Sequence, residues 1–153
     1  MIFDIVFIIL LLVAGLCAWQ IARTDFRRRI IPDVYLFPLL LIGLTVTHFF
    51  PWPISTTDSL VAAISGYILT SITGFVFTKI KSDSATPPIG FGDIKLITVG
   101  GIWLGTNGLA IALAVACLGG LIWGISKKQK FVPFAPFFVL GGILSLIITT
   151  FLI

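Results

Sequence analysis

The sequence predicts an all-α integral membrane protein, a polytopic bundle of six transmembrane helices in which the fourth is short. The composition is the first reason, because 58% of the 153 residues are hydrophobic and only 10% are charged. A soluble domain usually carries about 25% charged residues. A soluble globule of this size also leaves much of its surface in water, whereas lipid is a solvent for apolar surface. We expect one transmembrane domain over residues 1–153.

The second reason is the spacing of the apolar runs. Residues 94–125 form an apolar run that is too long for one ordinary span, which needs about 20 residues. A turn signal, Gly105-Thr-Asn-Gly108, divides this run. The runs are too long for barrel strands, so backbone hydrogen bonding in lipid requires helices. The expected spans cover residues 5–22, 34–50, 59–78, 94–104, 109–125 and 134 to the C-terminus.

The third reason is the position of the basic residues. With six spans and an external N-terminus, the cytoplasmic loops are residues 23–33, 79–95 and 126–133. These loops hold all ten Lys and Arg residues, as the positive-inside rule requires. A single helix between Lys95 and Lys127 would break that rule. We therefore expect both termini to be external, and we attribute the net charge of +4 to topology rather than to nucleic-acid binding.

The acidic residues are six Asp, four of which have a simple structural explanation. Asp4 and Asp58 precede apolar runs on the external side, and Asp33 immediately precedes the second span. Asp4 and Asp58 are expected to be helix N-caps or first-turn acids, and Asp33 is expected to be a helix N-cap. Asp83 lies in a polar linker and is expected to be solvated.

Asp25 and Asp93 are less well explained in this way. Asp25 is predicted to follow the first span by two or three residues, where pairing with neighbouring arginines is the structural alternative. Asp93 closes Gly90-Phe-Gly-Asp at the cytoplasmic start of the short span, where capping is the alternative. Gly90 and Gly92 either allow another backbone to approach or permit a positive φ beside the carboxylate.

Two aspartates on one membrane face suggest a reaction. Brought together, they can share one proton, so that one accepts a proton from water while the other donates to a carbonyl, as amide hydrolysis needs. His48, the only histidine, is predicted to lie on the opposite face. The two cysteines form no CxxC pair, so we expect no zinc site and no cofactor.

Three motifs resemble the type IV prepilin peptidases, the GxGD class of intramembrane aspartyl proteases. They are Asp25-Phe-Arg-Arg-Arg-Ile-Ile-Pro-Asp33, Gly90-Phe-Gly-Asp-Ile-Lys95 and Val132-Pro-Phe-Ala-Pro136, and the resemblance covers essentially the whole chain. It implies that Asp25 and Asp93 are catalytic. It also implies residues that bind substrate or shape the site, namely Gly90, Gly92, Lys95, Pro32 and Asp33.

The resemblance further implies the substrate and the location. The substrates would be prepilin or pseudopilin precursors, which carry a short basic leader ending in Gly followed by an apolar helix. The active site would lie at the cytoplasmic face of the inner or plasma membrane, among membrane lipids. The chain contains no domain with paired CxxC motifs, so it resembles the short, peptidase-only branch, from which N-methylation is not expected.

Four questions stay open at the level of sequence. Arg27, Arg28 and Arg29 should repel a basic leader, and they could instead hold Asp25 ionised or bind anionic lipid. A small proton- or ion-coupled transporter is the alternative function, although no inverted repeat is visible between the two halves. A structural role in a secretion complex is the third possibility. The oligomeric state is not given by the sequence.

Overall fold

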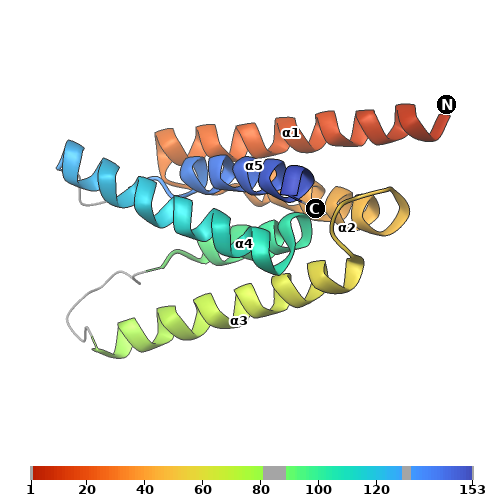
Figure 1. The fold of residues 1–153 in the computed structure, drawn as a ribbon. Helices are drawn as coiled ribbons and strands as arrows, with labels where there is room; N and C mark the ends of the chain where they lie inside the picture. The colour runs from red at the N-terminus through yellow and green to blue at the C-terminus, as the bar shows by residue number, and fades with distance from the viewer. Residues whose placement is uncertain (1, 81–88, 129–131, 153) are drawn as a thin grey trace.

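The structure, a computed structural model, describes residues 2–80, 89–128 and 132–152, and all of its regular secondary structure is helical (Figure 1). Three of the helices are long and apolar enough to cross a membrane, and the other two are shorter apolar helices. The helices are α1 (Ile2–Arg28), α2 (Asp33–Phe49), α3 (Thr56–Ile80), α4 (Phe91–Lys127) and α5 (Ala135–Leu152). The helical membrane class is confirmed, whereas the count of six helices is not. The predictions for Lys81, Asp83 and Lys130 lie outside the described residues.

Helix α4 is broken at the predicted turn. Gly105 has φ 65° and ψ −176°, a conformation that is essentially restricted to glycine. The two halves of α4 run in opposite directions against α5 (Figure 1). Along the first half of α4, Gly100 lies against Phe138 and Leu104 lies against Gly142, so the residue numbers of the α5 neighbours rise. Along the second half, Gly108 lies against Ser145 and Gly119 lies against Phe137, so these numbers fall. The first half, Phe91 to Leu104, is about 21 Å long at 1.5 Å per residue, shorter than a bilayer.

The backbone groups freed by this break have polar partners, as a low-dielectric surrounding requires. The Asp58 carboxylate in the first turn of α3 accepts hydrogen bonds from the Thr106 backbone N–H at 3.1 Å and from the Thr106 hydroxyl at 2.6 Å. On the other side of the break, the Trp52 indole N–H donates to the carbonyl of Trp103 at 3.0 Å. Asp58 is thus a first-turn acid, as expected, and it also joins α3 to the turn of α4.

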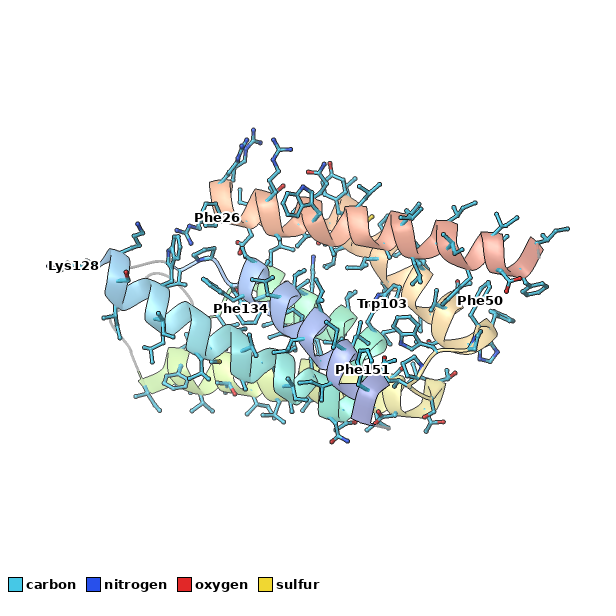
Figure 2. The ribbon with its side chains drawn as sticks, turned by 45° about the horizontal axis from the view of Figure 1, so that its top comes forward. Phe26, Phe50, Trp103, Lys128, Phe134 and Phe151 are labelled. Carbon is cyan, nitrogen blue, oxygen red and sulfur yellow. The ribbon has the colours of Figure 1, made fainter. Side chains whose placement is uncertain are left out.

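The two ends of the bundle differ in charge. We call the end that carries residues 23–33, 89–95, 127–128 and 132–134 the basic end, because every described Lys and Arg outside α3 lies there, and Lys79 lies in the last turn of α3 on the same side. All of these basic side chains are exposed. Both termini lie toward the opposite end (Figure 1). Figure 2 shows the same division, with Phe26, Lys128 and Phe134 toward one end and Phe50 toward the other.

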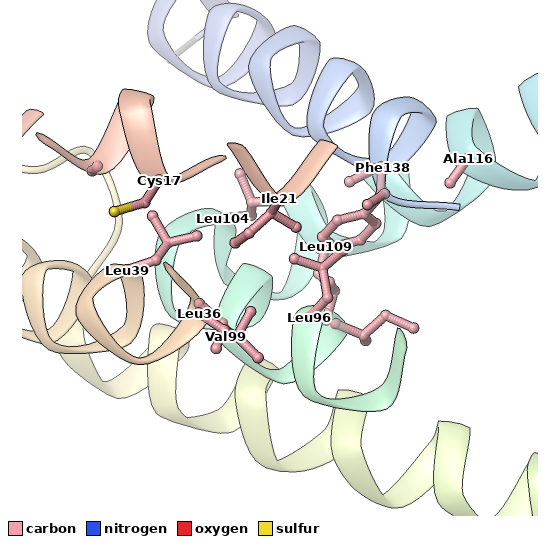
Figure 3. Packing of buried hydrophobic residues seen from close by; sticks show 14 of the residues in the cluster. Cys17, Ile21, Leu36, Leu39, Leu96, Val99, Leu104, Leu109, Ala116 and Phe138 are labelled. Atoms are coloured by element: carbon pink, nitrogen blue, oxygen red, sulfur yellow. The ribbon is translucent and has the colours of Figure 1, made fainter. Parts of the chain in front are cut away.

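The core is formed mainly between α1, α2, α4 and α5 (Figure 3). Its members include Cys17, Ile21, Leu36, Leu39, Leu96, Val99, Leu104, Leu109, Ala116 and Phe138. Helix α3 packs closely on the first half of α4, since a Cβ on Gly101 would lie only 2.6 Å from the Ala63 nitrogen. Many large apolar side chains point outward, and this is the pattern expected of surfaces that face lipid.

Candidate active site

Asp25 lies inside α1, not beyond its end as the sequence had suggested. Helix α1 continues to Arg28, and Arg29 follows in a left-handed conformation with its N–H donating to the Asp25 carbonyl at 2.9 Å. The apolar run ends at Ala22, where polar side chains begin. The helix does not end there, because its backbone hydrogen bonds do not depend on the polarity of the side chains. The Asp25 side chain is therefore carried on a rigid element, and only 5% of the residue is exposed.

The Asp25 carboxylate is held by the start of α5. Its Oδ2 accepts a hydrogen bond from the Ala135 N–H at 2.8 Å, and the Phe134 N–H also interacts with it. Ala135 is the first residue of α5, so these are the unpaired N–H groups of a helix N-terminus, which favour a negative charge. In the sequence, Val132–Pro136 was recognisable only as a motif, and no contact with Asp25 was predicted for it. Pro133 and Pro136 are a helix-start signal that could have suggested it.

Asp93 lies in the first turn of α4, and it is not the cap. The N-cap is Gly90, and the Asp93 carboxylate accepts a hydrogen bond from the Gly90 backbone N–H. Gly90 has φ −70°, so it does not provide a positive φ. Close approach explains both glycines, since a Cβ on Gly90 would lie 3.2 Å from Asp93 Oδ2, and a Cβ on Gly92 would lie 3.0 Å from the Ile31 Cβ.

The fold brings the two carboxylates near enough to interact electrostatically. The negative charge of Asp25 acts on Asp93, although the two residues come from different helices. Arg29 interacts electrostatically with Asp25, whereas Arg27 and Arg28 are exposed. The two aspartates therefore have different partners: Asp25 interacts with the N-terminus of α5 and with Arg29, whereas Asp93 interacts with the Gly90 backbone N–H.

Asp33 is not the N-cap of α2, contrary to the prediction. Pro32 occupies that position with extended φ and ψ, and its carbonyl accepts from the Tyr35 and Leu36 N–H groups, so the helix already includes Asp33. The Asp33 side chain instead forms an ion pair with Lys95, at 2.9 and 2.8 Å from the two carboxylate oxygens. This pair joins the start of α2 to the start of α4 at the basic end. Both partners are largely exposed.

Together these features define a helical membrane protein with two interacting carboxylates at the basic end of its bundle. The chain belongs to the type IV leader peptidase family, which it matches over residues 5–125. It is 31% identical over 145 residues to a prepilin leader peptidase/N-methyltransferase of Pseudomonas aeruginosa, covering 90% of this chain and 48% of the relative.

Two further relatives carry the same name. The protein from Pectobacterium carotovorum is 31% identical over 134 residues, covering 83% of this chain and 47% of the relative. The protein from Escherichia coli K12 is 29% identical over 128 residues, covering 80% and 55%. The chain thus spans about half the length of the curated relatives it matches. No solved structure matches it.

Proposed function

We propose that this protein is an intramembrane aspartyl endopeptidase that removes the short basic leader from type IV prepilin-like precursors, pilins or pseudopilins. The reaction would take place at the cytoplasmic face of the cell membrane, which is assigned to the basic end of the bundle. The observation that carries the proposal is that the starts of α4 and α5 and the end of α1 place Asp93 and Asp25 near enough to interact electrostatically at the basic end. Family membership supports the substrate class, because the relatives are named prepilin leader peptidases.

In this mechanism the two aspartates divide the work of one general acid and one general base. Burial disfavours the charged form of both carboxylates, but at Asp25 the N-terminus of α5 and Arg29 oppose this effect. We therefore assign Asp25 as the member of the pair that accepts a proton from the attacking water. Asp93 carries the shared proton and donates it to the oxygen of the scissile carbonyl. The water oxygen bonds to the carbonyl carbon, the C–N bond then breaks, and the departing nitrogen takes a proton from the pair. One amide and one water yield one carboxylic acid and one amine.

The neighbouring residues shape this pair. Gly90 and Gly92 leave room for the Asp93 carboxylate and for the loop that carries Ile31. The Asp33–Lys95 ion pair holds the start of α2 beside the start of α4. These residues position the helices and take no part in proton transfer in this proposal.

The test is leader removal by the purified full chain in lipid vesicles or detergent. A purified precursor of the pilin class is added, and the product is identified by its new N-terminal residue. We expect cleavage by the unaltered chain and none by Asp93→Asn at equal concentration. A well-folded chain that leaves every such precursor intact would refute the proposal, and proton uptake by the same vesicles would then favour a transporter.

A further inference from the structure

An apolar groove begins about one helical turn from the two aspartates and extends toward the middle of the bundle. Its volume is 210 Å³, and helices α1, α4 and α5 supply most of its lining. The lining includes small residues on all three helices: Ala14, Gly15 and Ala18 of α1, Gly100 of α4 and Gly142 of α5. Gly15 is exposed, so the groove is open to the surroundings of the bundle along α1.

The groove begins close to the candidate active site and follows the same three helices. Leu96 lines it and lies three residues after Asp93, and Phe138 lines it and lies three residues after Ala135. At 1.5 Å per helical residue, each is about 4.5 Å along its helix from the level of the carboxylates. Ala18 lies seven residues before Asp25, or about 10 Å. The groove therefore leads from the carboxylates toward the middle of the bundle.

The lining offers contacts to an apolar group and no charge. It includes two tryptophans, but the Trp52 indole N–H donates to the Trp103 carbonyl, and the Trp103 indole N–H donates to the Leu39 carbonyl, each at 3.0 Å. Neither donor is left for a ligand. An apolar protein cavity of about 150 Å³ suffices to hold benzene, so this groove has room for a large apolar side chain. Small residues along its walls let another backbone come close.

We infer that this groove receives an apolar side chain from the precursor, in the segment that follows the scissile bond. This inference rests on the proposed function and adds to it the place where the apolar part of the substrate binds. The apolar segment of such a precursor directly follows the scissile bond, and the apolar groove likewise begins about one helical turn from the two carboxylates, at Leu96 and Phe138. At about 3.3 Å per extended residue or 1.5 Å per helical residue, the part of the groove between Leu96 and Gly15 receives a side chain from roughly residues two to ten after the cleaved bond.

Gly15 provides a direct test because a side chain there fills the groove without disturbing the fold. A Cβ on Gly15 meets no other atom within 4 Å. Gly74 of α3 is the matched control, since its Cβ would have only one neighbour, the Ile89 Cβ at 3.9 Å, and it does not line the groove. We expect Gly15→Leu to lower kcat/KM for precursor cleavage about tenfold or more, the scale of losing one apolar pocket contact. Gly74→Leu should stay within about twofold, as is usual for a surface change.

A crosslinking measurement gives a second readout that does not depend on turnover. A Gly15→Cys chain carrying Asp93→Asn, Cys17→Ser and Cys117→Ser is mixed with precursors that carry a single cysteine after the cleavage site. Gly15 lies ten residues before Asp25, about 15 Å along α1, so we expect a disulfide crosslink to cysteines at roughly residues five to ten, and none from the equivalent Gly74→Cys chain.

The outcomes separate this inference from the proposed function. If the unaltered chain cleaves the precursor and Gly15→Leu cleaves it equally well, the groove holds lipid alone and the inference is wrong, while the proposed function stands. Equal losses in Gly15→Leu and Gly74→Leu, or crosslinks from both cysteines, also overturn it. If the unaltered chain cleaves no precursor, the proposed function fails and the inference fails with it.

Discussion

Removing the carboxylate of Asp58 should destabilise the turn that divides α4. Asp58 accepts two hydrogen bonds from Thr106, one from the backbone N–H at 3.1 Å and one from the hydroxyl at 2.6 Å. The first satisfies an N–H group at the start of the second half of α4, which Gly105 has separated from the first half. Asp58→Ala removes both bonds and leaves this N–H without its acceptor.

The size of the effect follows from these two contacts. Loss of a side chain that caps a helix start typically costs about 1 kcal/mol. A hydrogen bond to a charged group contributes about 1.5–3 kcal/mol. The two bonds share one side chain and do not simply add, so we expect Asp58→Ala to lower the free energy of unfolding by about 2–3 kcal/mol. Asp58→Asn keeps an acceptor oxygen and should lose about 1 kcal/mol.

The free energy of unfolding can be measured by titration with a denaturing detergent in mixed micelles. Thr57→Ala is the control, because Thr57 is exposed in the same first turn of α3 and should change stability by no more than about 0.5 kcal/mol. If Asp58→Ala proved as stable as Thr57→Ala, the carboxylate would not stabilise the break, and the account of the α4 turn would be wrong.

Three further predictions concern packing, charge and topology. Gly101→Val should lower the free energy of unfolding by about 1–3 kcal/mol, because a Cβ there already meets the backbone of α3 at 2.6 Å; unchanged stability would contradict the close packing. Asp33→Asn and Lys95→Met should each cost no more than about 1 kcal/mol and keep most cleavage activity, since the pair is exposed; an inactive but stable Asp33→Asn chain would assign Asp33 to the chemistry. In sealed vesicles, a membrane-impermeant thiol reagent should label Thr106→Cys and Lys127→Cys from opposite sides, and labelling of both from one side would reject the proposed topology.

The class of fold and the position of the α4 turn could be predicted because a bilayer constrains a sequence strongly. Apolar length sets the spans, and the clustering of basic residues sets which loops share a face. The division of the long apolar run at Gly105 followed from its length and from the positions of the basic residues. Only a reversal of the chain there places Lys95 and Lys127 at the same end. The structure contains this reversal, although it forms within the single element α4.

Helix ends and long-range contacts could not be predicted in this way. Hydropathy marks where polar side chains begin, so it placed Asp25 outside a helix that in fact continues to Arg28. The cap of α2 was displaced by one residue, because the carbonyl of Pro32 already accepts the first helical bonds. The contact between Asp25 and Ala135 joins residues 110 positions apart, and no local pattern reports it.

The central claim is that Asp25 and Asp93 act as one catalytic unit, and single Asn substitutions test it most directly. Asparagine keeps the shape of aspartate and can still accept the Ala135 N–H bond, so both variants should fold and insert normally. Asparagine cannot carry the shared proton, so each variant should lose leader cleavage by several powers of ten, and the double variant should be no worse than either single one. The measurement is the rate of leader removal from a purified precursor, with thermal stability followed in parallel. If either well-folded single variant kept more than about a tenth of the unaltered rate, that aspartate would not belong to the catalytic pair.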